Sequence, residues 1–104
     1  LEARTRALVQ RSVYLQGPVR QMAAIIADGD RSAMLRRIEA PTLVLHGEDD
    51  PLLPVAHGHD TAAAIPNARI RTFPGWGHDV PLELVDELAG EIARHARDAR
   101  TVAP

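Results

Sequence analysis

The sequence predicts an α/β fold in which two parallel strands are joined by a crossover helix and preceded by helices. Up to residue 40 the apolar side chains recur only at helical spacing. From Pro41 onward, two short strand-like segments alternate with two helical segments. Such strand–helix–strand connections join parallel strands through right-handed crossovers. We therefore expect parallel strands whose ends meet at one edge of a sheet.

The first forty residues are expected to form three short helices. The three segments are residues 1–16, 18–28 and 30–38, each with apolar side chains on one face. Pro18 suits the first turn of the second helix, and Asp30 is the expected N-cap of the third. The pattern indicates a small bundle or a lid, and we expect no chemistry in it.

The remaining chain supplies the strands. Residues 42–46 are apolar on both faces, as in a parallel strand that helices cover on both sides. A helix is expected over residues 55–65 and a second strand over residues 68–73. Because a two-stranded sheet is only marginally stable in water, further strands are expected from upstream sequence or from another chain.

The last helix is expected to begin at Pro81 and to continue to about residue 97. Apolar residues at helical spacing define its expected inward face, namely Val85, Leu88, Ala89, Ile92 and Ala96.

Composition narrows the class of protein. The net charge of −2 does not favour nucleic acid or an anionic membrane as a partner. No apolar run is long enough to span a bilayer. Zero cysteines exclude a disulfide scaffold and fit a reducing compartment such as the cytoplasm. Because the chain begins with Leu1 rather than Met and has 3% aromatic residues, we interpret it as a fragment.

Ionisable side chains follow both predicted strands. Glu48, Asp49 and Asp50 come after the first strand, and His78 comes after the second, behind a Gly-Trp-Gly loop. Functional groups of parallel sheets gather at the carboxyl ends of the strands. A carboxylate beside an imidazole forms two of the three members of a nucleophilic triad. The imidazole is the base, and the carboxylate orients it.

Two motifs carry a resemblance to a known family. "PTLVLHGEDDPLLP" (41–54) and "FPGWGHDVP" (73–81) together resemble the C-terminal part of α/β-hydrolase-fold enzymes of the serine esterase and lipase type. The overall sequence is most similar to small-molecule esterases such as the aclacinomycin methylesterase group. The resemblance implies that Asp50 is the catalytic acid and His78 the general base, in the chain order of the family.

The resemblance also implies how the chain is organised. Residues 1–40 correspond to the end of a variable helical cap and the helix that leads into the core. Residues 41–104 correspond to the C-terminal strand–helix–strand–helix part of the hydrolase core.

The chain departs from the family in lacking a nucleophile. No G-x-S-x-G motif occurs, and the only serines, Ser12 and Ser32, lie in helical patterns. We therefore expect the nucleophile and the oxyanion-hole donors to lie outside this chain, which alone should be inactive. The sequence leaves open whether the nucleophile is Ser, Asp or Cys.

Further residues allow two interpretations. Leu52, Leu53 and Val80 flank the pair and are candidates to bind an apolar part of the substrate, although core packing explains them equally well. His57 and His59 are residues of a metal-binding type. They point to different faces of a helix, however, so we assign no metal and no cofactor.

Two functions are compatible with these features. The first is a fragment of a hydrolase that acts on a small-molecule carboxylic ester or a related acyl bond. Its partners would be that substrate and the missing N-terminal part or a partner chain. The second is a non-catalytic assembly or ligand-binding domain on the same scaffold. Upstream sequence with or without G-x-S-x-G discriminates between them.

Overall fold

A computed structural model of the chain describes residues 2–11, 14 and 16–102, without the side chains of residues 101 and 102. The chain divides into two compact units, Leu1–Arg31 and Ser32–Pro104, which are taken here one at a time. Among the described residues, none of the helices combines the length and the apolar character needed to cross a membrane.

The first unit contains helices α1 (Glu2–Arg11) and α2 (Gly17–Asp28). α2 has Pro18 in its first turn and ends at Gly29, whose φ of 62° suits glycine. The predicted helix over residues 1–16 was too long, because α1 is described to Arg11 and the described residues Tyr14 and Gln16 are not helical. Residues 12, 13 and 15 lie outside the described part of the chain. The apolar face of α2 is exposed, with Val19 at 71% and Ile26 at 74%.

The second unit contains the sheet. Its elements in chain order are α3 (Ser32–Leu35), β1 (Thr42–Gly47), α4 (Val55–Ala64), β2 (Ala68–Phe73), η1 (Leu82–Leu84) and α5 (Val85–Val102). β1 and β2 pair in parallel, with Thr42 opposite Ala68 and Gly47 opposite Phe73. The predicted α/β fold class with two parallel strands is confirmed. In the part of the chain described, these two strands make up the whole sheet.

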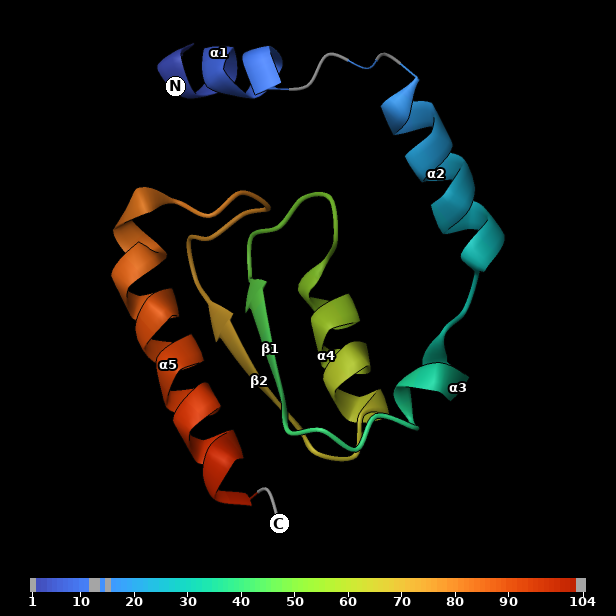
Figure 1. The fold of residues 1–104 in the computed structure, drawn as a ribbon, viewed down its shortest axis with the longest axis vertical. Helices are drawn as coiled ribbons and strands as arrows, with labels where there is room; N and C mark the ends of the chain where they lie inside the picture. Colours follow the sequence, from blue (N-terminus) through green and yellow to red (C-terminus); the bar gives the residue numbers. More distant parts are fainter. Residues whose placement is uncertain (1, 12–13, 15, 103–104) are drawn as a thin grey trace. The chain divides into compact units, whose positions relative to one another are not determined.

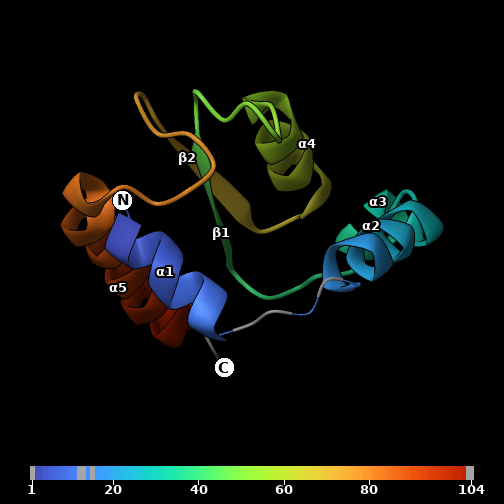
Figure 2. The ribbon, with the colours of Figure 1, turned by 90° about the horizontal axis from the view of Figure 1, so that it is seen from above.

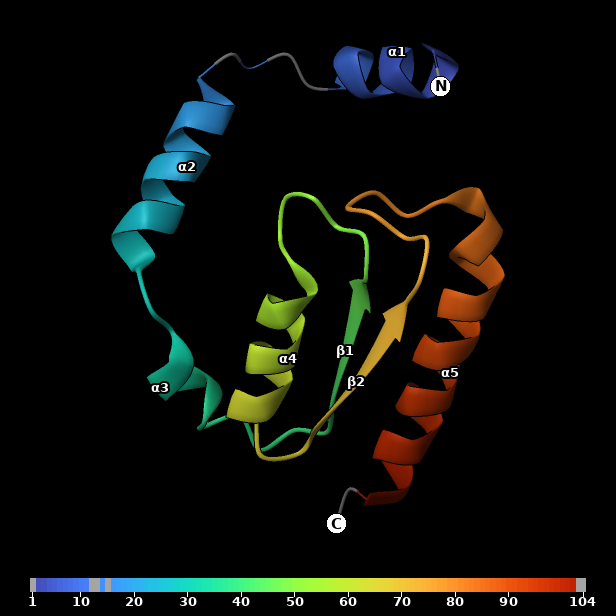
Figure 3. The same ribbon diagram turned by 180° about the vertical axis from the view of Figure 1, so that it is seen from behind.

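Helices cover both faces of this sheet. α4 lies on one side and α5 on the other, and the front and back views agree (Figure 1, Figure 3). The view from above shows β1 and β2 between the two helices (Figure 2). Side chains alternate accordingly, because successive residues of a strand point to opposite faces. Leu45 packs toward the α5 side, while His46 contacts Gly58 of α4.

A cluster of buried apolar residues lies on the α5 side, close to the carboxyl ends of the strands. Phe73, Trp76 and Leu88 are almost fully buried, and Leu45 and Leu84 pack against them. The rings of Phe73 and Trp76 meet edge to face with centroids 5.6 Å apart, a favourable aromatic geometry. The core therefore fixes the start of the loop that carries the candidate base.

The inward face of α5 differs from the prediction. Leu88 is buried as expected, but Val85 and Ile92 are 44% and 55% exposed, and Ala89 and Ala96 are also exposed. Glu91 is buried in their place, at 2% exposure.

Arginines compensate the buried carboxylate of Glu91. Arg71 of β2 contacts it at 2.8 Å, Arg69 lies 3.6 Å away, and Arg94 donates a hydrogen bond to it. Burial raises the pKa of Glu91, but the Arg94 hydrogen bond and the arginine charges outweigh this effect, so its pKa is lowered from 4.5. A charged pairing with β2 thus determines which face of α5 is inward.

A pair of glycine substitutions tests the close approach of the loop after β2 to Gly47 at the end of β1. A Cβ on Gly47 would lie 2.1 Å from the carbonyl oxygen of Trp76, whereas a Cβ on Gly90 in α5 would meet open space. We expect Gly47→Ala to lower the free energy of unfolding by about 1–3 kcal/mol because backbone must move. Gly90→Ala should raise it by up to about 1 kcal/mol, since alanine favours helix. Urea unfolding followed by circular dichroism measures both, and equal stability of the two variants would contradict this packing.

Candidate active site

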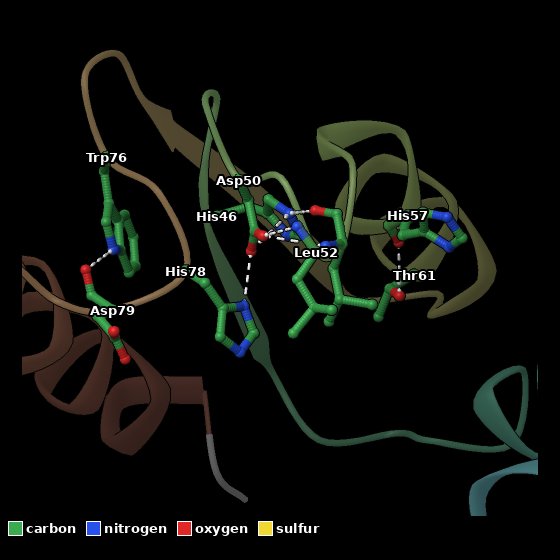
Figure 4. A network of polar contacts seen from close by, with 9 residues as sticks. His46, Asp50, Leu52, His57, Thr61, Trp76, His78 and Asp79 are labelled. Carbon is green, nitrogen blue, oxygen red and sulfur yellow. Dashed lines mark hydrogen bonds and ion pairs between the residues drawn. The ribbon is translucent and has the colours of Figure 1, made fainter. Parts of the chain in front are cut away.

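Asp50 is held firmly at the end of β1. Its Oδ1 accepts hydrogen bonds from the backbone N–H groups of Leu52 and Leu53, at 2.8 and 2.9 Å. Its Oδ2 lies 2.9 Å from Nδ1 of His78 (Figure 4). The side chain of Asp50 is 7% exposed. Both carboxylate oxygens are therefore engaged, which fixes the orientation of the group.

These contacts keep the carboxylate ionised. The pKa of Asp50 falls from 3.8 to about 2. The largest cause is the hydrogen bond from the Leu53 N–H; burial opposes it, and the hydrogen bonds from His78 and Leu52 add to the lowering. At neutral pH Asp50 therefore acts only as an acceptor.

The hydrogen bond to Asp50 fixes the chemistry of the His78 ring. Because an ionised carboxylate cannot donate, Nδ1 of His78 carries the proton in this pair. In the neutral ring Nε2 is then the basic atom, on the ring edge away from Asp50. The side chain is 48% exposed, so this nitrogen is open to a reactant. The geometry is that of a general base with its orienting acid.

His46 fixes the loop that carries Asp50. Its Nε2 donates to the carbonyl oxygen of Leu53 at 2.7 Å and lies 3.9 Å from Oδ2 of Asp50. On the other side its ring packs on α4, because a Cβ on Gly58 would approach Nδ1 to 2.8 Å. His46 thus connects strand, loop and helix, as its place at the end of β1 permits.

Further hydrogen bonds fix the two loops in place. The N–H of Glu48 donates to the carbonyl oxygen of Phe73 at 3.0 Å, which extends the β1–β2 ladder by one step. Trp76 donates its indole N–H to the carbonyl oxygen of Asp79 at 3.1 Å, which closes the loop around His78 (Figure 4). Asp50 and His78, the candidate acid and base, therefore lie on loops that are hydrogen-bonded to one connected framework.

A cavity of about 210 Å³ opens beside the pair. Leu45, Leu53 and Trp76 give it apolar walls, and Asp50 and His78 line it as well.

The structure places only one of the three predicted substrate-binding residues at this cavity. Leu53 lines it, whereas Leu52 and Val80 are 66% and 39% exposed and are not among the lining residues. The substrate contacts of all three remain predictions.

The backbone of His57 takes part in a hydrogen bond within α4. Thr61 donates its hydroxyl to the carbonyl oxygen of His57 at 2.8 Å within the helix (Figure 4). In the ranges that the structure describes, no group of three or more histidine and acidic side chains could hold a metal ion.

Sequence reasoning missed three features of the site. It did not predict the bond from His46 to Leu53, the contact between loops that Gly47 allows, or the bond from Asp49 to the His78 loop. The only available signal was the glycine placed directly after an apolar strand, which often marks a close backbone approach.

The sequence matches the family described as "alpha/beta hydrolase fold" over residues 15–83. It is 44% identical to a non-heme haloperoxidase of Rhodococcus erythropolis over 59 residues, which cover 56% of this chain and 22% of that protein. It is 38% identical to the rhodomycin D methylesterase DauP of Streptomyces sp. (strain C5) over 69 residues, covering 66% of this chain and 23% of that protein.

Among solved structures, the fold is similar to that of the esterase RhEst1 from Rhodococcus sp. ECU1013. The TM-score is 0.50 at 30% identity, over 60% of this chain and 24% of that one. The chain therefore spans about a quarter of the length of the relatives it matches. With the family match extending over most of its residues, this chain belongs to the α/β hydrolase fold family.

Proposed function

We propose that this chain supplies the acid and the general base of a Ser-Asp-His triad in a hydrolase of small-molecule carboxylic esters or related acyl bonds. The observation that carries the proposal is the 2.9 Å contact between Asp50 Oδ2 and His78 Nδ1 at the carboxyl ends of neighbouring parallel strands. The order of Asp50 before His78 agrees with the order of the triad in this fold.

In the proposed mechanism, Nε2 of His78 takes the hydroxyl proton of a serine as its oxygen attacks the ester carbonyl carbon. Asp50 stabilises the imidazolium that forms. The proton then passes from His78 to the departing alkoxide, which leaves an acyl-enzyme. In the second half of the reaction, His78 removes a proton from water, whose oxygen attacks the acyl carbon. His78 then gives this proton to the serine oxygen as the bond between that oxygen and the acyl carbon breaks, which releases the acid and restores the serine and the neutral imidazole.

The ester substrate is supported by relatives and by the cavity. DauP is named a methylesterase and RhEst1 an esterase. The walls formed by Leu45, Leu53 and Trp76 suit an apolar acyl or alkyl group beside the reacting carbonyl. In this proposal Leu52 and Val80 contribute to the same apolar surface once substrate is bound.

The nucleophile belongs, in this proposal, to a part of the protein outside these 104 residues. The chain spans about a quarter of its relatives, and its sequence contains no G-x-S-x-G motif. Residues 1–40 would be the end of the cap and residues 41–104 the C-terminal part of the core. The remaining part or a partner chain would supply the serine, in a cytoplasmic enzyme without nucleic-acid or membrane partners.

Substitutions in the complete polypeptide test the assignment of the pair. With a p-nitrophenyl ester as substrate, His78→Ala and Asp50→Asn should each reduce kcat by about 10³–10⁴-fold, since the base or its orientation is lost. Glu48→Gln, a carboxylate change in the same loop, serves as the control and should retain most of the activity.

The isolated 104-residue chain is expected to give no turnover of p-nitrophenyl acetate. Turnover by this chain alone that His78→Ala abolishes would place the nucleophile inside it and overturn the proposal. Upstream sequence without a G-x-S-x-G motif, together with an inactive complete protein, would favour the non-catalytic assembly or ligand-binding domain instead.

The pH dependence of stability tests the environment of Asp50. Because its pKa is lower in the folded chain than its ordinary value, ionised Asp50 stabilises the fold. This contribution is fully present above pH 3.8 and is lost as the pH falls through about 2. The urea midpoint should therefore fall more steeply over this interval for the wild type than for Asp50→Asn. Parallel curves for the two proteins would show that these hydrogen bonds do not hold the carboxylate.

A further inference from the structure

We propose that Asp49 is a positioning residue, whose carboxylate ties the loop of His78 to the loop of Asp50 and so holds the imidazole against its acid. The expected effect of Asp49 on kcat rests on the proposed function, whereas its effect on the position of the His78 ring does not. From the sequence, Asp49 is expected to be either a solvated carboxylate or one that supports the catalytic candidates without reacting, and the structure shows which atoms it contacts.

The tie consists of two hydrogen bonds that run in opposite directions. The backbone N–H of Gly75 donates to Oδ2 of Asp49 at 2.7 Å, and the backbone N–H of Asp49 donates to the carbonyl oxygen of Trp76 at 3.1 Å. The first has an ionised acceptor, which makes it stronger than a bond between neutral groups. Asp49 therefore holds two consecutive residues of the His78 loop.

The place of this tie determines where the ring of His78 lies. Gly75 adopts a φ of +74°, so the loop turns sharply at the residue that Asp49 holds. His78 follows close behind it, and its side chain is 48% exposed, so packing does little to locate the ring. The position of the ring relative to Asp50 then depends on how firmly the start of the loop is anchored.

Asp49 could also act through its negative charge rather than through its hydrogen bond to Gly75. A comparison with Glu48 separates these two effects. Glu48 is an exposed carboxylate in the same loop, but its Oε1 accepts from the hydroxyl of Thr72 in β2 at 2.7 Å. Removing either side chain removes one negative charge from the loop that follows β1. Only the removal of the Asp49 side chain removes the hydrogen bond from Gly75, whereas the backbone bond from Asp49 to Trp76 remains in both variants.

Four variants of the complete polypeptide test the inference by kinetics. Asp49→Ala should lower kcat by about 10²-fold with little change in KM, as expected for a small misplacement of the base. Asp49→Asn should keep most of kcat, because its amide oxygen accepts the same N–H. Glu48→Ala, the matched charge control, should also stay near the wild type. Asp49→Glu keeps the charge but displaces the carboxylate, and should lose activity as Asp49→Ala does.

Some kinetic outcomes would overturn the inference. Equal losses in Asp49→Asn and Asp49→Ala would show that charge, not the hydrogen bond, matters. Wild-type kcat in Asp49→Ala would show that the tie is dispensable. If Asp49→Ala does not fold, the comparison of Asp49→Glu with Asp49→Asn decides the same question.

Nuclear magnetic resonance supplies a readout that needs no turnover. The Gly75 amide should exchange slowly with solvent in the wild type and in Asp49→Asn, and faster in Asp49→Ala. The Nδ1 proton of His78 should give a downfield signal that is lost in Asp49→Ala. These changes in an inactive wild-type protein would refute the proposed function and leave the inference standing. Fast Gly75 exchange in an active wild type would overturn the inference alone.

Discussion

The arrangement of the site depends on the direct contact of two backbones above the sheet. The loop after β2 crosses Gly47 so closely that a Cβ there would meet the Trp76 carbonyl oxygen at 2.1 Å. Parallel pairing of β1 with β2 brings the two strand ends to one edge, but pairing alone leaves the loops free to diverge. The absence of a side chain at Gly47 lets the loops bond to each other, and the contact of Asp50 with His78 follows from that.

Different forces act at the two ends of the sheet. Near the site, the packing of Phe73, Trp76 and Leu88 is apolar and fixes the root of the His78 loop. Farther from the site, the buried carboxylate of Glu91 is neutralised by arginines that include Arg71 of β2. A buried charge needs good geometry to avoid a net cost, so this pairing specifies the orientation of α5 more than it stabilises it. The apolar cluster is thus the rigid support of the site.

Much of this architecture was predictable from the sequence, because hydrophobic periodicity reports which face of an element is covered. The strands and the crossover follow from spacing, and the meeting of acidic residues with His78 follows from the strand ends. The choice of Asp50 among the three acids came from the resemblance to the hydrolase family. The prediction that Ile92 lies on the inward face of α5 was wrong, because Glu91 is buried there instead. The periodicity of one helix does not show that an acidic residue is paired with an arginine on another element. The bond from Asp49 to Gly75 was missed for a related reason, because spacing does not say which atoms meet across two loops.

The acid–base pair is specified by a short part of the chain. The partners of the Asp50 carboxylate, Leu52, Leu53 and His78, and the histidine that fixes its loop, His46, all lie within residues 46–78. No group from outside this segment is needed to set the tautomer of His78 or to keep Asp50 ionised. In the proposed function, the nucleophile would have only to reach Nε2 of an imidazole that is already oriented. If His78 is the base, as we propose, such a segment can serve nucleophiles of different chemistry without changing its own structure, because the orientation of the base does not depend on what it deprotonates.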